Sequence, residues 1–333
     1  MKMKRILAVI LTVALISSLA VFSGVTAFAA SDKYELKLST TQTDTSMIYA
    51  GMKAAADKIL EDTDGHVVVS IYPSGQLGVE EDMIDQALQG MGIAVLTDAG
   101  RMSSYVNDMG ILNMAYFVDT YEDGVKVMET DTFKAWDEEL HAQGLHPLCY
   151  NYFDGSRSFM GHKAFNTPAD LKGVVIRTPG AAPYTKSIEA LGATPYNIAW
   201  GEVYNGIQTK AIDGCEVQNT SAVSSKIYEV CEVASMTEHI NLFNFVVCGQ
   251  AWFDKLPAEY QEIVEKDFQE CAYQNAQEVI AAQADLIQTL VDNGMEIVEV
   301  DKEPFKEGAK SAYEALGWTD LRTNLYAEAG LDY

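Results

Sequence analysis

Residues 171–218 read LKGVVIRTPGAAPYTKSIEALGATPYNIAWGEVYNGIQTKAIDGCEVQ, and short apolar runs in this stretch alternate with helical patterns. The predicted elements are a strand, a helix, a strand, a helix and a strand, at residues 174–177, 181–191, 195–199, 202–209 and 212–217. Alternation of this kind is typical of an α/β fold with a mainly parallel sheet. The stretch also places Arg177 at the end of a predicted strand and directly before a Thr-Pro-Gly turn, where it could hold an anion.

The same alternation occurs near the start of the chain. The predicted strands and helices follow one another at residues 34–38, 48–59, 67–72, 79–89 and 93–96. Ligands of such sheets bind beyond the carboxyl ends of the strands. Residues 39–46 and 98–101 lie at such ends, so we expect a ligand site there.

A chain of 333 residues is longer than one hydrophobic core usually serves, so two lobes are expected. The turn at residues 154–157 and the β-like segment at residues 242–252 are the predicted crossings between them. Residues 256–293 contain no proline after Pro257 and no glycine, which predicts one helix of roughly 36 residues, about 54 Å long. Such a helix is longer than one lobe and would tie two lobes together around a cleft.

The first 29 residues have the pattern of a secretory signal peptide. Lys2, Lys4 and Arg5 precede an apolar run at residues 6–15, and Ala-Phe-Ala at residues 27–29 has the form of a cleavage site. The net charge of −25 includes three positive and no negative groups in this segment, so the mature chain would carry −28. Nucleic acid and anionic membranes are therefore poor partners. We expect an exported protein, located in the periplasm or outside the cytoplasm.

Five cysteines are an odd number for an exported chain, and none of them forms a C-x-x-C pair. Buried free thiols that act as small hydrophobic side chains are the expected state. The five residues are Cys149, Cys215, Cys231, Cys248 and Cys271.

Sequence motifs of enzymes, cofactor sites and metal sites are missing. The chain has no G-x-S-x-G, no phosphate-binding loop, no dinucleotide-binding glycine motif and no H-E-x-x-H, and its five histidines are scattered. We therefore expect neither catalysis nor a cofactor nor a metal. An exported hydrolase whose site is assembled in space stays open as an alternative, as does the binding component of an ATP-driven (ABC) importer or of a sensor.

Arginines are the best candidates for holding an anion. Arginine matches a carboxylate or a sulfonate with two parallel hydrogen bonds and stays charged in a closed cleft. Arg157, at the end of the predicted turn, and Arg177 could converge on one acid group, and Trp200 could cover an apolar face of the ligand. The alternative is that each arginine forms a structural salt bridge with one of the 48 acidic residues.

Four ordered segments carry a resemblance to a known family. They are YPSGQLG at 72–78, DLKGVVIRTP at 170–179, EVY at 202–204 and DGCE at 213–216. In order and spacing they resemble the solute-binding proteins of TRAP (tripartite ATP-independent periplasmic) transporters of the DctP type. The resemblance covers essentially the whole mature chain.

The resemblance implies a two-lobed α/β fold like that of periplasmic binding proteins (class II type), with mainly parallel sheets and a long helix spanning both lobes. The expected lobes are residues 30–154 plus 243–282 and residues 155–242 plus 283–333. In the family, the arginine that matches Arg177 holds the ligand carboxylate. The full set of candidate contacts is Arg177, Arg157, Trp200, Asp98, Arg101, Gln218, Asn219 and Asn244.

The resemblance also implies a small organic acid as ligand and two membrane partners, the small and the large TRAP subunit, which use an ion gradient. A monomer is expected. One departure concerns the ligand: where the family's sialic acid binders carry Asn-Pro after Asp-Gly-x-Glu, this chain has Val217, Gln218 and Asn219. The departure argues against sialic acid, because a common polar ligand contact is missing or moved to Gln218 or Asn219. A smaller carboxylate or sulfonate fits the bulkier Trp200 better.

Overall fold

The computed structural model describes residues 33–332, so the predicted signal peptide at residues 1–29 lies outside the described part. The strands are β1 (Tyr34–Ser39), β2 (Val67–Tyr72), β3 (Ile93–Asp98), β4 (Leu145–Gly161), β5 (Val175–Thr178), β6 (Thr194–Asn197), β7 (Gly214–Gln218), β8 (Val233–Gly249) and β9 (Glu296–Glu299). The α-helices are α2 (Met47–Asp62), α3 (Glu80–Leu88), α4 (Ala99–Met102), α5 (Tyr121–Met128), α6 (Asp131–Ala142), α7 (Ala182–Ala190), α8 (Val203–Gln208), α9 (Asn219–Ser224), α10 (Gln250–Phe253), α11 (Ala258–Ala281), α12 (Gln283–Asp292), α13 (Glu303–Leu316) and α14 (Thr319–Ala329). Four 3₁₀ helices complete the order: η1 (Asn107–Asn113), η2 (Pro168–Leu171), η3 (Trp200–Glu202) and η4 (Ile227–Glu229).

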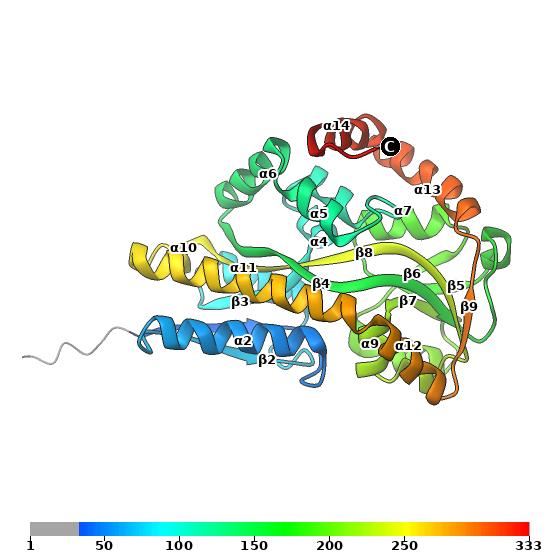
Figure 1. The fold of residues 1–333 in the computed structure, drawn as a ribbon, viewed down its shortest axis with the longest axis horizontal. Coiled ribbons are helices and arrows are strands. Elements are labelled where there is room, and N and C mark those ends of the chain that lie inside the picture. The colour runs from blue at the N-terminus through cyan, green and yellow to red at the C-terminus, as the bar shows by residue number, and fades with distance from the viewer. Residues whose placement is uncertain (1–32, 333) are drawn as a thin grey trace, which may run out of the picture. The chain divides into compact units, whose positions relative to one another are not determined.

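One mixed sheet runs through both lobes. Its strand order is β2-β1-β3-β8-β4-β7-β5-β6, and β9 pairs with β8. The pairs within β1–β3 and within β5–β7 are parallel, and so is β8 with β9, whereas β4 and β8 join the two groups by antiparallel pairing. The fold is therefore the predicted two-lobed α/β fold, with its parallel groups connected by two long strands (Figure 1).

The long strand β4 corrects one expectation from the sequence. Residues 154–157 were expected to form a turn between the lobes, but they lie inside this 17-residue strand. Gly155 has a φ of 93°, which few other residues adopt, and the register with β8 shifts between Phe153 and Ser156. The glycine therefore produces an irregularity that the strand passes through, rather than a reversal of the chain.

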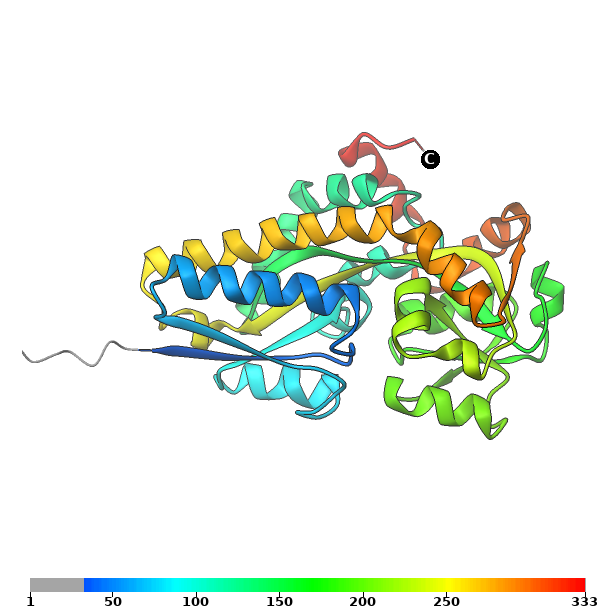
Figure 2. The same cartoon turned by 60° about the horizontal axis from the view of Figure 1, so that its bottom comes forward.

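The predicted long helix is present as two consecutive helices. Ala282 separates α11 from α12, so the predicted single helix at residues 256–293 is wrong in its continuity. Helix α11 packs against α2 and β4, whereas α12 packs against α9 and β9, so the pair reaches from one lobe to the other (Figure 2). The lobe limits themselves stay a prediction; α14 packs against α5, although the prediction placed these two helices in different lobes.

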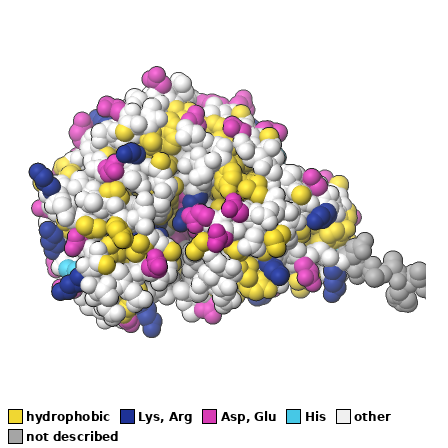
Figure 3. Space-filling model, turned by 180° about the vertical axis from the view of Figure 1, so that it is seen from behind, with side chains coloured by type: hydrophobic (Ala, Val, Ile, Leu, Met, Phe, Trp, Pro, Cys, Tyr) yellow, Lys and Arg dark blue, Asp and Glu magenta, His cyan; other side chains and the backbone are white. Residues whose placement is uncertain are grey.

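Many acidic side chains are exposed to solvent. Figure 3 shows one face, with acidic and basic side chains next to each other near its middle and hydrophobic patches around them. Within the described residues, no helix combines the length and the hydropathy needed to cross a membrane.

Candidate functional site

Strand pairing brings the candidate residues together. Arg157 on β4 lies opposite Gln218, the last residue of β7, and Arg177 on β5 lies beside Cys215 of β7. In the other lobe, Asp98 ends β3 and lies opposite Asn244 of β8. Sheet register therefore directs side chains that are far apart in the sequence toward one region between the lobes.

A small cavity of about 60 Å³ lies in this region, which we call the inner cavity. Seven of the eight candidate residues line it: Asp98, Arg101, Arg157, Arg177, Trp200, Gln218 and Asn244. The eighth, Asn219, is not part of the lining; its amide nitrogen donates to the side-chain oxygen of Gln283 at 3.2 Å. Of the two positions proposed after the Asp-Gly-x-Glu motif, the structure brings only Gln218 to the cavity.

Arg157 is neutralised by a buried carboxylate. Its Nη2 donates to Glu216 Oε1 (2.8 Å) and to the Glu216 carbonyl oxygen (2.7 Å), and its Nε also donates to the carboxylate. Burial alone would raise the pKa of Glu216, but the charge and hydrogen bonds of Arg157, together with His239, outweigh burial and hold the pKa at about 2. Arg157 therefore forms the structural salt bridge that was the alternative interpretation of the arginines. It also lines the inner cavity.

Arg177 differs from Arg157, because no carboxylate pairs with it within residues 33–332. Its Nε and Nη2 both donate to the Ile198 carbonyl oxygen at 3.1 Å, which leaves Nη1 without a protein acceptor. The side chain is 3% exposed, and burial together with the like charge of Arg157 lowers its pKa to about 10. Arg177 is thus charged at neutral pH, almost fully desolvated and incompletely hydrogen-bonded. An anion could supply the counter-charge and the acceptor that this side chain lacks.

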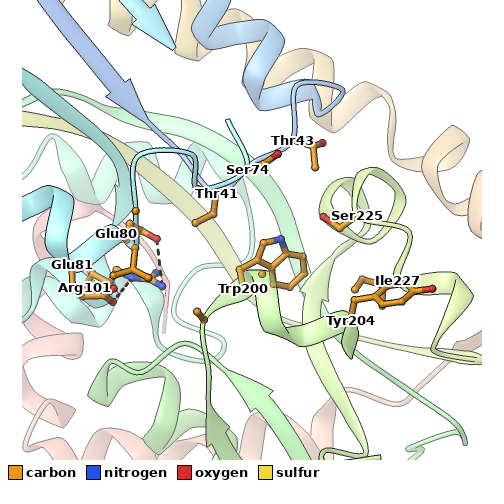
Figure 4. Close-up of a pocket in the computed structure, with 15 residues that line it drawn as sticks. Thr41, Thr43, Ser74, Glu80, Glu81, Arg101, Trp200, Tyr204, Ser225 and Ile227 are labelled. Atoms are coloured by element: carbon orange, nitrogen blue, oxygen red, sulfur yellow. Dashed lines mark hydrogen bonds and ion pairs between the residues drawn. The ribbon is translucent and has the colours of Figure 1, made fainter. Parts of the chain in front are cut away.

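Arg101 on α4 is surrounded by carboxylates. Its Nη1 lies 2.8 Å from Asp98, its Nε 3.1 Å from Glu81 and its Nη2 3.4 Å from Glu80, so each guanidinium nitrogen faces a different acid group. Figure 4 shows the contacts with Glu80 and Glu81. Asp98 also caps α4 by accepting from the Arg101 amide. Burial raises the pKa of Glu80 to about 7 against the opposing charge of Arg101. We call these four residues the Arg101 cluster.

A larger cleft of about 460 Å³, the outer cleft, adjoins the inner cavity and shares Thr41, Glu80, Arg101 and Trp200 with it. In Figure 4, the indole of Trp200 lies between Thr41 on one side and Tyr204 on the other. The Trp200 ring centre is 5.3 Å from the Arg177 guanidinium carbon, within range of a cation–π contact. A ligand held at Arg177 would therefore lie beside the indole and extend into the outer cleft.

Several lining residues were not singled out from the sequence. Thr41 and Gln42 follow β1, within the segment at residues 39–46 that was expected to face a ligand, whereas Glu80 and Ser221 carried no signal. Asn244 was a candidate, and the structure adds that its buried Nδ2 has no hydrogen-bond partner among the described residues. An unpaired donor at the wall of a cavity is a natural contact for a ligand oxygen.

The described residues contain neither a candidate metal site nor an activated thiol at Cys149. No group of three or more His, Cys, Asp or Glu side chains there could hold a metal ion. All five cysteines are buried and free, as expected from the sequence. Burial raises the pKa of Cys149 to about 12, so this thiol is not activated as a nucleophile.

Comparison with known proteins adds a family. The family model of the bacterial extracellular solute-binding proteins, family 7 (DctP), matches residues 38–317. The chain is 25% identical to the sialic acid-binding periplasmic protein SiaP of Vibrio cholerae over 84% of this chain and 87% of that protein. It is 28% identical to the 2,3-diketo-L-gulonate-binding periplasmic protein YiaO of Escherichia coli, over 88% of each.

Solved structures give the same result. A TRAP periplasmic solute-binding protein from Ochrobacterium anthropi with bound L-fuconate superimposes with a TM-score of 0.87 at 27% identity, over 89% of this chain and 99% of that one. One from Actinobacillus succinogenes with bound L-galactonate gives a TM-score of 0.84 at 25% identity, with the same two coverages.

Proposed function

Because the chain belongs to the DctP family of bacterial extracellular solute-binding proteins, we propose that it captures a small organic acid between its lobes for a TRAP transporter. The observation that carries the proposal is the state of Arg177, which is buried and charged and has no carboxylate partner in the described part of the chain. An acid group of the ligand supplies the missing partner. Contacts of charged groups strengthen when a closing cleft excludes water, since the local dielectric constant falls.

Each lining residue has a role in this proposal. Arg177 binds the acid group with Nη1, and Arg157, oriented by Glu216, lends a second positive charge nearby. Asn244 and Gln218 offer amide groups to the ligand, and Trp200 covers one of its faces. Asp98 and Arg101 form the opposite wall. Relatives of known specificity support an acid as ligand, since they bind sialic acid, 2,3-diketo-L-gulonate, L-fuconate and L-galactonate.

Ligand binding would favour the closed arrangement of the lobes by population shift. The closed protein would then deliver the acid to the small and large membrane subunits, outside the cytoplasm. The proposed role is binding without catalysis, carried out by a monomer after export.

A thermal-shift screen of carboxylates, sugar acids and sulfonates, with neutral and cationic compounds of similar size as controls, tests the proposal. We expect at least one acid to raise the melting temperature, and mass spectrometry of the bound acid after incubation should return it unchanged. Stabilisation by neutral or cationic compounds alone would refute the proposal, and chemical conversion of the acid would favour the exported hydrolase instead.

A further inference from the structure

We infer that the site selects organic acids that carry one acid group and rejects those with a second, and that Glu80 and Asp98 are the residues that impose this selectivity. The inference rests on the proposed function and specifies its ligand class. It follows from how charge is distributed over the three arginines of the inner cavity.

The three arginines do not offer three anion sites. Arg157 is paired with Glu216, which is fully buried, and every guanidinium nitrogen of Arg101 faces a carboxylate of its cluster. Nη1 of Arg157 also has no hydrogen-bond acceptor among residues 33–332, but Glu216 neutralises the charge of Arg157. Of the three arginines, Arg177 alone has no carboxylate partner among these residues. The inner cavity therefore offers one unpaired cation, which can neutralise one acid group of a ligand.

The wall opposite Arg177 would repel a second acid group. Asp98 and Glu80 line the inner cavity and are at most 9% exposed, so solvent screens them weakly. Glu80 is partly protonated at neutral pH, because burial raises its pKa to about 7. The two negative charges of Asp98 and the more exposed Glu81 still exceed the single positive charge of Arg101. A like charge brought against such a wall is strongly unfavourable, whereas hydroxyl or ammonium groups could donate to it.

Size does not account for this selectivity. The inner cavity of about 60 Å³ opens into the outer cleft of about 460 Å³, which has room for the second carboxylate of a small diacid. Charge at the shared wall, where Glu80 and Arg101 lie, is the remaining difference between a monoacid and a diacid of equal length.

Matched acids test the inference on the wild-type protein. Each pair has the same number of carbons and differs in one terminal group: glycerate and tartronate, erythronate and meso-tartrate, galactonate and galactarate. By isothermal titration calorimetry, we expect the monoacid of the best-binding pair to bind at least about tenfold more tightly than its diacid. A diacid that binds equally well or better overturns the inference and leaves the proposed function intact. If none of these acids binds, and no acid in the wider thermal-shift screen does, the proposed function fails and the inference falls with it.

Charge-neutral variants test the named residues. Glu80→Gln should reduce the ratio of the diacid Kd to the monoacid Kd by about tenfold, because it removes a carboxylate from the wall and its ion pair with Nη2 of Arg101. Asp98→Asn should act in the same direction and serves as a second variant in case Glu80→Gln does not fold. Asp82→Asn is the matched control: it removes an acid from the same helix at an exposed position and should leave the preference unchanged. An unchanged preference in both folded wall variants, or an equal effect of the control, would overturn the assignment.

Discussion

Replacing each of the two buried arginines by methionine should separate a binding residue from a structural one. In ligand-free protein, Arg177→Met removes a charge that burial disfavours: the pKa falls from 12.5 to about 10, a cost of about 3 kcal/mol at neutral pH. The substitution also loses two hydrogen bonds to Ile198, about 1 kcal/mol each, and a contact with Trp200 of about 1 kcal/mol. These effects nearly cancel, so the free energy of unfolding should change by less than about 1 kcal/mol.

Arg157→Met should behave differently, although its side chain is equally buried. It leaves Glu216 without its cation at a position with no exposure to solvent. Removing one partner of a buried ion pair costs about 3–5 kcal/mol, so this variant should be clearly destabilised.

Urea unfolding followed by circular dichroism measures both stabilities, and calorimetry with the best-binding acid measures affinity. Arg177→Met should lose affinity by about a hundredfold or more while keeping its stability. The reasoning is refuted if Arg177→Met is destabilised as strongly as Arg157→Met, or if it still binds the acid with wild-type affinity.

Three further predictions concern pH, the indole and the thiols. Burial raises the pKa of Glu80 from 4.5 to about 7, so the folded protein binds more protons than the unfolded chain between these pH values. The free energy of unfolding should therefore fall as the pH rises from 4.5 to 7. Urea titrations at successive pH values measure this slope, which Glu80→Gln should flatten. Trp200→Ala should weaken acid binding about three- to tenfold in calorimetry, and a variant with unchanged affinity would remove the indole from the site. All five cysteines should react with a thiol reagent only after unfolding, and a reductant should leave the melting temperature unchanged; fewer than five reactive thiols in denaturant would reveal a disulfide.

Local sequence patterns correctly predicted individual strands and the position of Arg177 within one of them. The strand at residues 67–72 was predicted with the bounds that β2 has, and Arg177 was placed at a strand end because an apolar run stops there before a proline. Gly155 misled the prediction, since glycine beside polar residues usually marks a turn. The surrounding pairing of β4 with β7 and β8 overrides that local preference.

Pairings across the fold could not be predicted in the same way. Glu216 was quoted within a motif, but its hydrogen bonds to Arg157 join two residues that lie 59 positions apart in the sequence, on different strands. The role of Glu80 depends likewise on α3 packing next to β3, which positions it beside Arg101. The sequence therefore indicated the arginines, whereas only the structure distinguishes the neutralised ones from the one that is available.

A crystal structure with the acid that stabilises the protein most would test the central claim most directly. We predict an oxygen of the acid group about 2.7–3.2 Å from Nη1 of Arg177, with the rest of the ligand beside Trp200. An acid group bound at Arg101, or one bound outside the inner cavity while Arg177 stays unpaired, would contradict the account.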